Sequence, residues 1–264
     1  MVPADKMLSA RIVEDRTRQE KSGRWTTDGT KVSSEVLATD PDTLFPLQGA
    51  LGYEVTQTLF VGKNTLLVEG PGDLLYLSAF SRALKSRGRP SLDARWTICP
   101  AGGIDKIQSF VSLFAGAKLR IAAITDFAKS DAKKLDQLRK TRIIDAQNLL
   151  TYAEVLGKEE ADVEDIFDVD TYVELLNESF LLTGSNTLKS AKLAAHSATT
   201  SRQLKQAELA FRLLTADTPE FDHYTPAEWL IRQPDFLEKN SDAMSRTLAN
   251  AETIILALNS RLPT

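Results

Sequence analysis

Acidic side chains at short spacings are the residues of this sequence best suited to chemistry. Glu69 and Asp73 lie four residues apart, on either side of a Gly-Pro-Gly turn. A strand that ends at Glu69 and a helix that begins near Asp73 would direct both carboxylates into one cavity. Carboxylate oxygens are the ligands that hard divalent cations prefer. Capping of the helix N-terminus is the alternative role for Asp73.

Two other acidic positions fit the same chemistry. Asp126 follows an apolar segment, and a carboxylate at the end of a buried strand is costly unless it is paired or bound to a cation. Its alternative role is to cap the next helix. Asp162 and Glu164 are two residues apart, so an extended backbone would direct both toward one metal ion. A solvated acidic loop is the alternative there.

These residues follow the strands of a predicted parallel sheet. Short apolar segments alternate with helical patterns, which is typical of βαβ units. The strands are predicted at 65–68, 96–99 and 119–124, and the helices at 74–88, 107–116 and 132–140. Because ligands bind at the carboxyl ends of parallel strands, Glu69, Gly102, Gly103 and Asp126 should meet at one edge. Gly102 and Gly103 precede a helix whose first N–H groups we expect to be free for a phosphate, with Lys106 beside them.

Three regions are expected along the chain. Residues 1–60 form a polar N-terminal segment, irregular to about residue 40 and helical from 40 to 60. Residues 61–170 hold the sheet, and residues 171–264 form a mainly helical region. Its helices are predicted at 172–182, 199–214, 226–231 and 242–262. The last of these helices could pack internally or form the face of a homodimer.

Composition excludes several classes of protein. The 264 residues are 42% hydrophobic and 26% charged, which is enough for a substantial core. The single Cys99 excludes an intramolecular disulfide, and two histidines exclude a His-rich metal cage. No apolar run is long enough to span a bilayer, and the first residues lack a signal-peptide core. We therefore expect a cytoplasmic protein that has no membrane partner.

Charge is unevenly distributed along the chain, although the net charge is only −4. Residues 151–178 contain ten acidic residues and one basic residue. Residues 129–142 contain six basic and two acidic residues, and residues 186–214 contain five basic residues and one acidic residue. An acidic centre between basic stretches suits metal-dependent work on a polyanion such as DNA. Solvated helix faces are the alternative explanation.

Residues 68–73 and 100–106, followed by a buried strand that ends at Asp126, resemble the Toprim domain of topoisomerases, primases and some nucleases. A longer match, over 66–77, 95–106 and 160–165 and together with 221–227, is similar to the OLD (overcoming lysogeny defect) family of nucleases. The resemblance extends over roughly residues 40–260. It implies a Toprim (Rossmann-like) parallel sheet with flanking helices, followed by a mainly helical C-terminal region.

The resemblance also implies DNA cleavage that uses two Mg²⁺ or Mn²⁺ ions. Glu69, Asp73 and Asp126 match the acidic cluster of Toprim domains. Asp162 and Glu164 match the pair that completes the second metal site in OLD enzymes. The two ions would clamp the scissile phosphate, activate a water and stabilise the leaving oxygen.

A lysine from the helical region is a further expectation from the resemblance, because the family uses one to stabilise the developing phosphate charge. Lys205 is the best match in this sequence. Lys189 and Lys192 are the alternatives.

Two features depart from the family pattern. Ala128 stands where Toprim proteins usually carry the second Asp of Asp-x-Asp, and Ser130 and Asp131 are the candidate substitutes. OLD proteins normally begin with an ATPase domain, but this sequence has no Gly-x-x-x-x-Gly-Lys-Ser/Thr loop. We therefore expect no ATP site in this chain. The chain would be either a nuclease part whose ATPase partner acts in trans or a shortened relative.

The sequence thus predicts a divalent-metal-dependent DNA endonuclease, in defence against phage or foreign DNA or in DNA repair. The alternative is a catalytically degenerate Toprim module that binds DNA or a partner ATPase without cleaving, because Ala128 removes an expected ligand. Topoisomerase or primase chemistry is less favoured. The tyrosines lack an obvious context for strand transfer, and the length hardly accommodates the template-handling domains of a primase.

Overall fold

The computed structural model describes residues 12–19, 25–33, 62–114, 119–141, 144–215 and 218–263. The chain divides into two compact units, Met1–Phe60 and Val61–Thr264. In the first unit, β1 (Ile12–Gln19) and β2 (Trp25–Ser33) form a two-stranded antiparallel sheet with a register shift between Asp15 and Thr17.

This small sheet corrects the prediction that the first forty residues are irregular. Both strands are rich in Thr, Val and Ile, whose branched side chains favour extended backbone. Charged residues between them interrupt the alternating apolar pattern by which a strand is recognised in a sequence. The helix predicted over residues 40–60 lies outside the described residues.

A parallel four-stranded sheet forms the centre of the second unit. It contains β3 (Asn64–Val68), β4 (Trp96–Pro100), β5 (Arg120–Thr125) and β6 (Leu149–Thr151), in the order β4-β3-β5-β6. The three predicted strands are confirmed. The sequence analysis missed β6, because three residues are too few to display a strand pattern.

The strand register brings four chain segments to the same edge of the sheet. Val68 is paired with Pro100 and with Ile124, and Thr125 is paired with Thr151. Since all four strands run in the same direction, the residues that follow them leave the sheet together.

Helices surround this sheet and continue through the described residues that follow it. The α-helices are α2 (Pro71–Ser86), α3 (Ile104–Phe114), α4 (Ala132–Lys140), α5 (Tyr152–Leu156), α6 (Val169–Ser179), α7 (Ser190–Ala194), α8 (Gln203–Phe211), α9 (Tyr224–Arg232) and α10 (Asp242–Asn259). Short 3-10 helices are η3 (Lys129–Asp131), η4 (Ala146–Asn148), η5 (Val163–Ile166), η6 (Gly184–Asn186) and η7 (Pro234–Glu238). No helix in the described part of the chain is long and apolar enough to cross a membrane.

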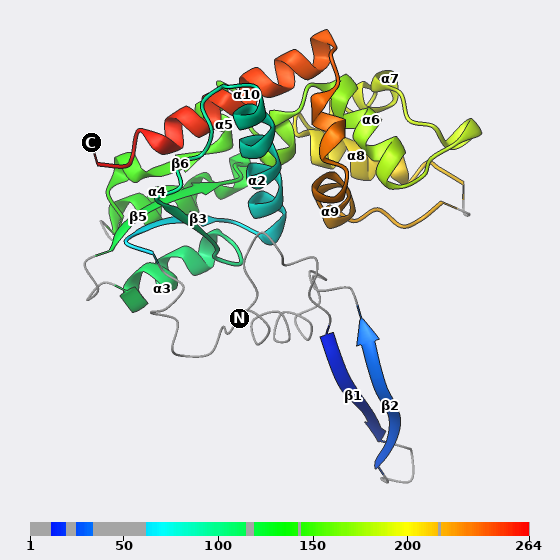
Figure 1. Ribbon diagram of the computed structural model, residues 1–264, viewed down its shortest axis with the longest axis horizontal. Helices are drawn as coiled ribbons and strands as arrows, with labels where there is room; N and C mark the ends of the chain where they lie inside the picture. Colours follow the sequence, from blue (N-terminus) through cyan, green and yellow to red (C-terminus); the bar gives the residue numbers. More distant parts are fainter. Residues whose placement is uncertain are drawn as a thin grey trace. The chain divides into compact units, whose positions relative to one another are not determined.

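The last helix joins the helical region to the sheet region. Figure 1 shows α10 and α3 on opposite sides of the sheet. Contacts of α10 with α2, α5 and α6 bury its apolar residues, among them Leu248, Ile255 and Leu258. Its apolar face is therefore internal. The domain boundary predicted near residue 170 lies inside the second compact unit.

An aromatic cluster strengthens the same junction. The ring of Phe167, which follows η5, lies 5.3 Å from Tyr76 and 4.9 Å from Phe80, both on α2, and 5.8 Å from Tyr172 on α6. Phe167 is fully enclosed. These contacts fix the segment before Phe167, which carries several of the predicted site residues, against α2.

Two leucines on α10 provide a matched test of this packing. Leu258 is 0% exposed and Leu256 is 50% exposed. We expect Leu258→Ala to lower the free energy of unfolding by about 2–5 kcal/mol, since it removes buried methyl groups and leaves a cavity. Leu256→Ala should cost less than about 1 kcal/mol. Urea denaturation of both variants measures the difference, and equal losses would show that α10 does not pack as described.

Candidate acidic site at the sheet edge

Glu69 lies at the centre of the sheet edge, directly after β3. Its backbone carbonyl accepts hydrogen bonds from the N–H groups of Gly102 and Gly103, each at 3.0 Å. Its carboxylate Oε2 accepts the N–H of Asp126 at 3.3 Å. Glu69 therefore links the ends of β3, β4 and β5 through its own backbone and side chain.

Asp73 is held from two sides in the first turn of α2. Its Oδ2 accepts the N–H of Gly70 at 2.9 Å, which confirms the alternative role in capping. Its Oδ1 accepts the hydroxyl of Tyr152 at 2.8 Å. Tyr152 is fully buried and directly follows β6. The capping bond does not exclude a second role, because each carboxylate oxygen has two lone pairs.

Asp126 joins the sheet to the distant acidic segment. The neighbouring residue Phe127 exchanges two backbone hydrogen bonds with Ala161, at 2.9 and 3.0 Å. In addition, the Asp126 Oδ1 accepts the N–H of Val163 at 3.2 Å. Asp126 does not cap the next helix, because the residue at that position is Ala128. The alternative role for Asp126 is therefore wrong.

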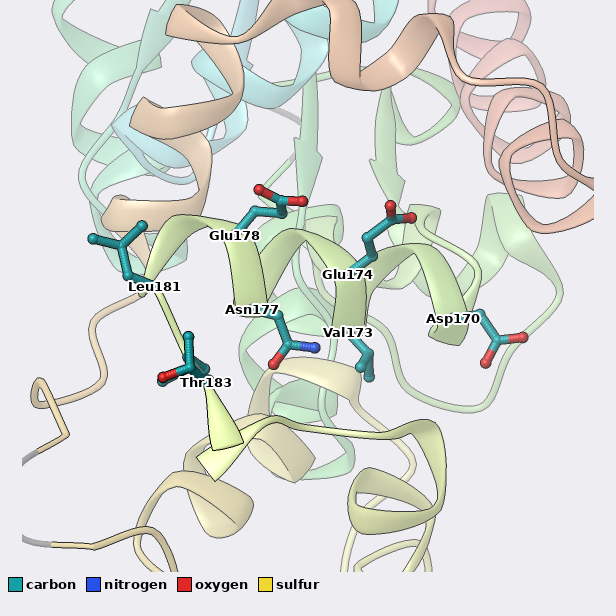
Figure 2. Close-up of a pocket in the computed structure, with 8 residues that line it drawn as sticks. Asp170, Val173, Glu174, Asn177, Glu178, Leu181 and Thr183 are labelled. Atoms are coloured by element: carbon teal, nitrogen blue, oxygen red, sulfur yellow. The ribbon is translucent and has the colours of Figure 1, made fainter. Parts of the chain in front are cut away.

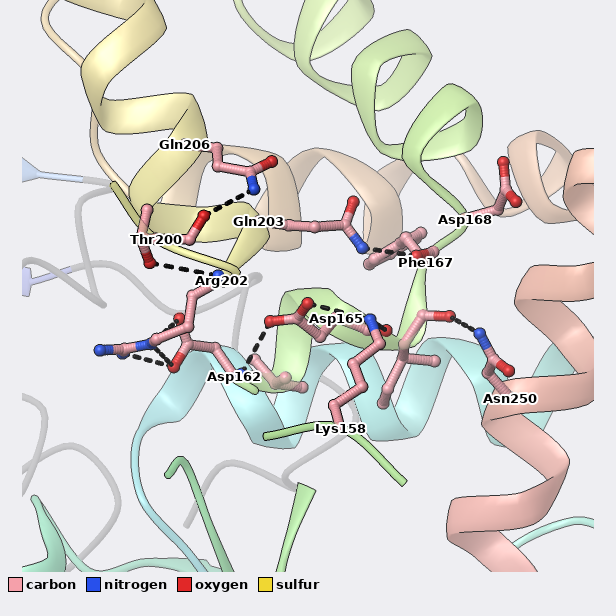
Figure 3. Close-up of polar contacts among 12 residues, drawn as sticks. Lys158, Asp162, Asp165, Phe167, Asp168, Thr200, Arg202, Gln203, Gln206 and Asn250 are labelled. Carbon is pink, nitrogen blue, oxygen red and sulfur yellow. Dashed lines mark hydrogen bonds and ion pairs between the residues drawn. The ribbon is translucent and has the colours of Figure 1, made fainter. Parts of the chain in front are cut away.

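Asp162 is paired with a cation from the helical region. Arg202 Nε lies 2.7 Å from Oδ1 and 2.9 Å from Oδ2 of Asp162, and Arg202 Nη2 also contacts Oδ1. Figure 3 shows the guanidinium against this carboxylate. The Asp162 side chain is 0% exposed. A solvated acidic loop is therefore wrong for this segment.

Glu164 is buried too, but the segment is not extended as the sequence analysis expected. Residues Val163–Ile166 form the 3-10 helix η5, because Asp162 and Asp165 cap its start reciprocally. A 3-10 turn does not direct alternate side chains to the same side as a strand does. The negative charge of Glu164 acts on Tyr76 and Tyr172, and it raises the pKa of both hydroxyls after the larger effect of their burial.

Burial and mutual repulsion raise the pKa values of these five carboxyls, Glu69, Asp73, Asp126, Asp162 and Glu164, here called the acidic cluster. Burial and the charge of Asp73 raise the pKa of Glu69 to about 7. Burial raises the pKa of Asp73 to about 6, against the opposing effect of the Tyr152 hydroxyl. Burial likewise raises the pKa of Asp126 and of Glu164 well above the usual range. For Asp162, burial outweighs the Arg202 charge and the pKa is about 6.

The predicted phosphate site needs a correction. Gly102 and Gly103 have φ values of 82° and 114°, which favour glycine, and both N–H groups are directed at the Glu69 carbonyl. These N–H groups are therefore not free to bind an anion. Lys106 is exposed, and its Nζ lies 3.5 Å from the position that a Cβ on Gly102 would take. A phosphate contact by Lys106 stays a prediction.

The three candidate lysines have different surroundings. Lys205 on α8 pairs with Glu208 at 2.8 Å, and its charge is one of those that lower the pKa of Asp162. Lys192 donates to the backbone carbonyls of Ser185 and Thr187. Lys189 is exposed. The role of Lys205 stays a prediction.

The carboxylates of the acidic cluster do not all fit a metal ion equally well. All donors are carboxylate oxygens, the type that Mg²⁺ and Mn²⁺ prefer. The Asp126 N–H donates to the Glu69 carboxylate, and neither carboxylate forms an ion pair with another described residue, so both fit as ligands. Asp162 does not fit, because Arg202 holds its oxygens. As the described residues stand, no three His, Cys, Asp or Glu side chains form a group that could hold a metal.

Ser130 and Asp131 are the candidate substitutes for the acidic ligand that Ala128 does not provide. Ala128 is buried and offers no ligand. The charge of Asp131 contributes to the raised pKa of Glu69 and Asp131 is half-buried, whereas Ser130 is exposed. Of the two candidate substitutes, Asp131 is therefore the better placed.

Cavities elsewhere do not include the acidic cluster. One of about 420 Å³ is lined by α6 and the residues after it, among them Asp170, Glu174 and Leu181 (Figure 2). Another, of about 380 Å³, is lined by Phe211, Phe221 and neighbouring residues.

A parallel sheet with Glu-Gly-x-x-Asp after its first strand and an Asp after its third is the arrangement of a Toprim domain. Residues 60–127 match the family model described as Overcoming lysogenization defect protein-like, TOPRIM domain. This part of the chain is an OLD-like Toprim domain, and the resemblance found in the sequence is confirmed. The chain therefore carries a module of a Toprim nuclease family.

Solved structures with a similar course of the chain include two OLD proteins. The C-terminal region of the Burkholderia pseudomallei OLD protein is 15% identical with a TM-score of 0.45, and the match covers 74% of this chain and 100% of that chain. The C-terminal region of the Xanthomonas campestris pv. campestris OLD protein is 16% identical with a TM-score of 0.43, covering 75% and 98%. No curated protein matches this sequence.

Two residues of the site escaped the sequence analysis. Arg202 lies three residues before Lys205 in the same basic stretch, but nothing in that stretch points to Asp162. Tyr152 follows a strand too short to be recognised. Ligands gather at the carboxyl ends of parallel strands, so this rule would have pointed to Tyr152 if β6 had been recognised in the sequence.

The raised pKa values predict how stability depends on pH without metal. A carboxyl with a higher pKa in the folded state binds its proton more tightly there, so folding is disfavoured as pH rises from the unfolded toward the folded pKa. In EDTA, the Tm should fall between about pH 5 and pH 7.5, and Glu69→Gln should reduce that fall. Glu159→Gln is the control, because Glu159 is exposed and Lys129 lowers its pKa. An unchanged slope in Glu69→Gln would contradict the assignment.

Proposed function

We propose that this protein is a cytoplasmic, divalent-metal-dependent endonuclease that hydrolyses phosphodiester bonds in DNA. The observation that carries the proposal is the convergence of Glu69, Asp73 and Asp126 at one edge of the sheet, with pKa values raised by burial and mutual repulsion. Buried like charges are costly, and a bound cation would offset that cost. The OLD-like Toprim match over residues 60–127 supports the same reaction class.

In this proposal Glu69 and Asp126 hold the ion at the ends of β3 and β5. The bound ion would supply Lewis-acid stabilisation of the phosphate and a more acidic water. The N–H of Asp126 orients the Glu69 carboxylate, and the N–H of Val163 orients that of Asp126. Asp73 is fixed by Gly70 and Tyr152, so it faces the site without freedom to rotate. Such support from surrounding groups is typical of metal sites.

DNA would be bound by cations around the acidic cluster. The charge of Lys205 on α8 contributes to the pKa of Asp162, and Lys106 is exposed beside the turn after β4. The lysines of α4 are exposed, although two of them pair with acidic neighbours, for example Lys134 with Asp105 at 2.9 Å. Exposed pairs of this kind are weak and can exchange for phosphate.

A second candidate function is DNA or partner binding without cleavage. The observation that favours it is the buried Ala128, which leaves the third strand with one acidic ligand. The proposed protein acts with an ATPase partner in trans, forms a homodimer and serves in phage defence or DNA repair.

A supercoiled-plasmid assay distinguishes these functions. We expect nicking in Mg²⁺ or Mn²⁺, none in EDTA, and a loss of more than about 100-fold in Glu69→Gln, since changes in the second shell of metal sites alone cost about 10–100-fold. The matched control Glu159→Gln should nick like the parent, because Glu159 is 80% exposed.

Nicking by Glu69→Gln at the parent rate, or nicking in EDTA, would refute the metal assignment. DNA binding in a fluorescence anisotropy titration without nicking in any metal would favour the binding module.

A further inference from the structure

Arg202 occupies the part of the site that a second metal ion would need. Its guanidinium contacts both oxygens of Asp162 through Nε, with a further contact from Nη2. Figure 3 shows this pair between α8 and the segment that follows the Phe127–Ala161 bridge. A planar guanidinium matches a carboxylate in this manner. An ion that used the same oxygens would have to displace it.

Glu164 does not compensate for this loss. It lies within η5, where its charge acts on Tyr76 of α2 and Tyr172 of α6, whereas Asp162 faces Arg202 at the start of α8. The charge of Asp162 also raises the pKa of Glu164, after the larger effect of burial. Because Arg202 holds the Asp162 oxygens, a second ion would lose Asp162 as a ligand.

Arg202 also faces the first metal site. Arg202 binds Asp162, and the next residue, Val163, donates its N–H to the Asp126 carboxylate at 3.2 Å, so the guanidinium lies near a proposed ligand of the metal ion. The charge of Asp126 also acts to raise the pKa of this guanidinium. The Arg202 side chain is 18% exposed, and its Nη1 takes no part in the pair with Asp162. A partly exposed guanidinium with a remaining donor is suited to contact a phosphate oxygen.

We propose that the Arg202 guanidinium, and not a second metal ion, supplies the positive charge on the Asp162 side of the site, so that the protein binds one divalent ion per chain. The inference rests on the proposed function, because that one ion is the one held by Glu69 and Asp126. In this arrangement Arg202 would contact a phosphate oxygen beside this ion.

Manganese binding to the full chain tests the number of ions directly. Free Mn²⁺ is followed by electron paramagnetic resonance during titration of the parent, Asp162→Asn and Glu69→Gln. We expect one Mn²⁺ per parent chain, an affinity within about threefold of the parent for Asp162→Asn, and at least about a tenfold loss for Glu69→Gln.

Two ions per parent chain, one of which is lost in Asp162→Asn, would overturn the inference and leave the proposed nuclease intact. No bound Mn²⁺ in the parent would overturn the metal assignment itself, and with it both proposals. The two failures are therefore distinguishable.

Variants of the ion pair test the role of Arg202. Arg202→Gln alone leaves the buried Asp162 carboxylate without its partner and can impair folding. The double variant Asp162→Asn with Arg202→Gln removes both charges, so we expect it to fold, as circular dichroism would verify. Its nicking should fall at least about tenfold, and the slope of log Kd for DNA against log salt should fall by about 1. Parent-like nicking and an unchanged slope would show that Arg202 only neutralises Asp162.

Discussion

Phe127 and Ala161 exchange two backbone hydrogen bonds where the chain leaves β5, and the acidic cluster depends on this short bridge. It places Asp126 and Asp162, neighbours of the bridged residues, beside each other although they are 36 positions apart in the sequence. The Val163 N–H then binds the Asp126 carboxylate. Without the bridge, the carboxylates at the sheet edge would not lie beside Asp162.

Burying several carboxylates close together costs free energy, and hydrogen bonds to the individual carboxylates offset part of this cost. Backbone N–H groups and one tyrosine hydroxyl bind Glu69, Asp73 and Asp126. These bonds orient the carboxylates but do not neutralise them, which is why their pKa values stay raised. Asp165 has a cationic partner, because Lys158 contacts it at 3.0 Å, although burial still raises the pKa of Asp165.

The helical region completes the site as well as the core. Arg202, next to α8, reaches Asp162, and α10 packs on α2, whose first turn carries Asp73. Contacts of this kind explain why residues 61–264 cluster as one compact unit. A change in the position of α8 would alter the charge at the sheet edge, so the two regions are coupled through the Asp162–Arg202 pair.

The sequence by itself determined β3, β4, β5 and α2, and it pointed to Glu69, Asp73 and Asp126, because hydrophobic periodicity and turn residues are local signals. Only the tertiary structure decided the partners of those residues. The Gly102 and Gly103 donors are consumed by Glu69, η5 replaces an extended segment, and Arg202 binds Asp162 from 40 positions away. β6 and the β1–β2 sheet were likewise missed, since neither carries a distinctive apolar pattern. Ion pairs and hydrogen bonds between distant segments depend on how the elements pack, and no local pattern encodes that packing.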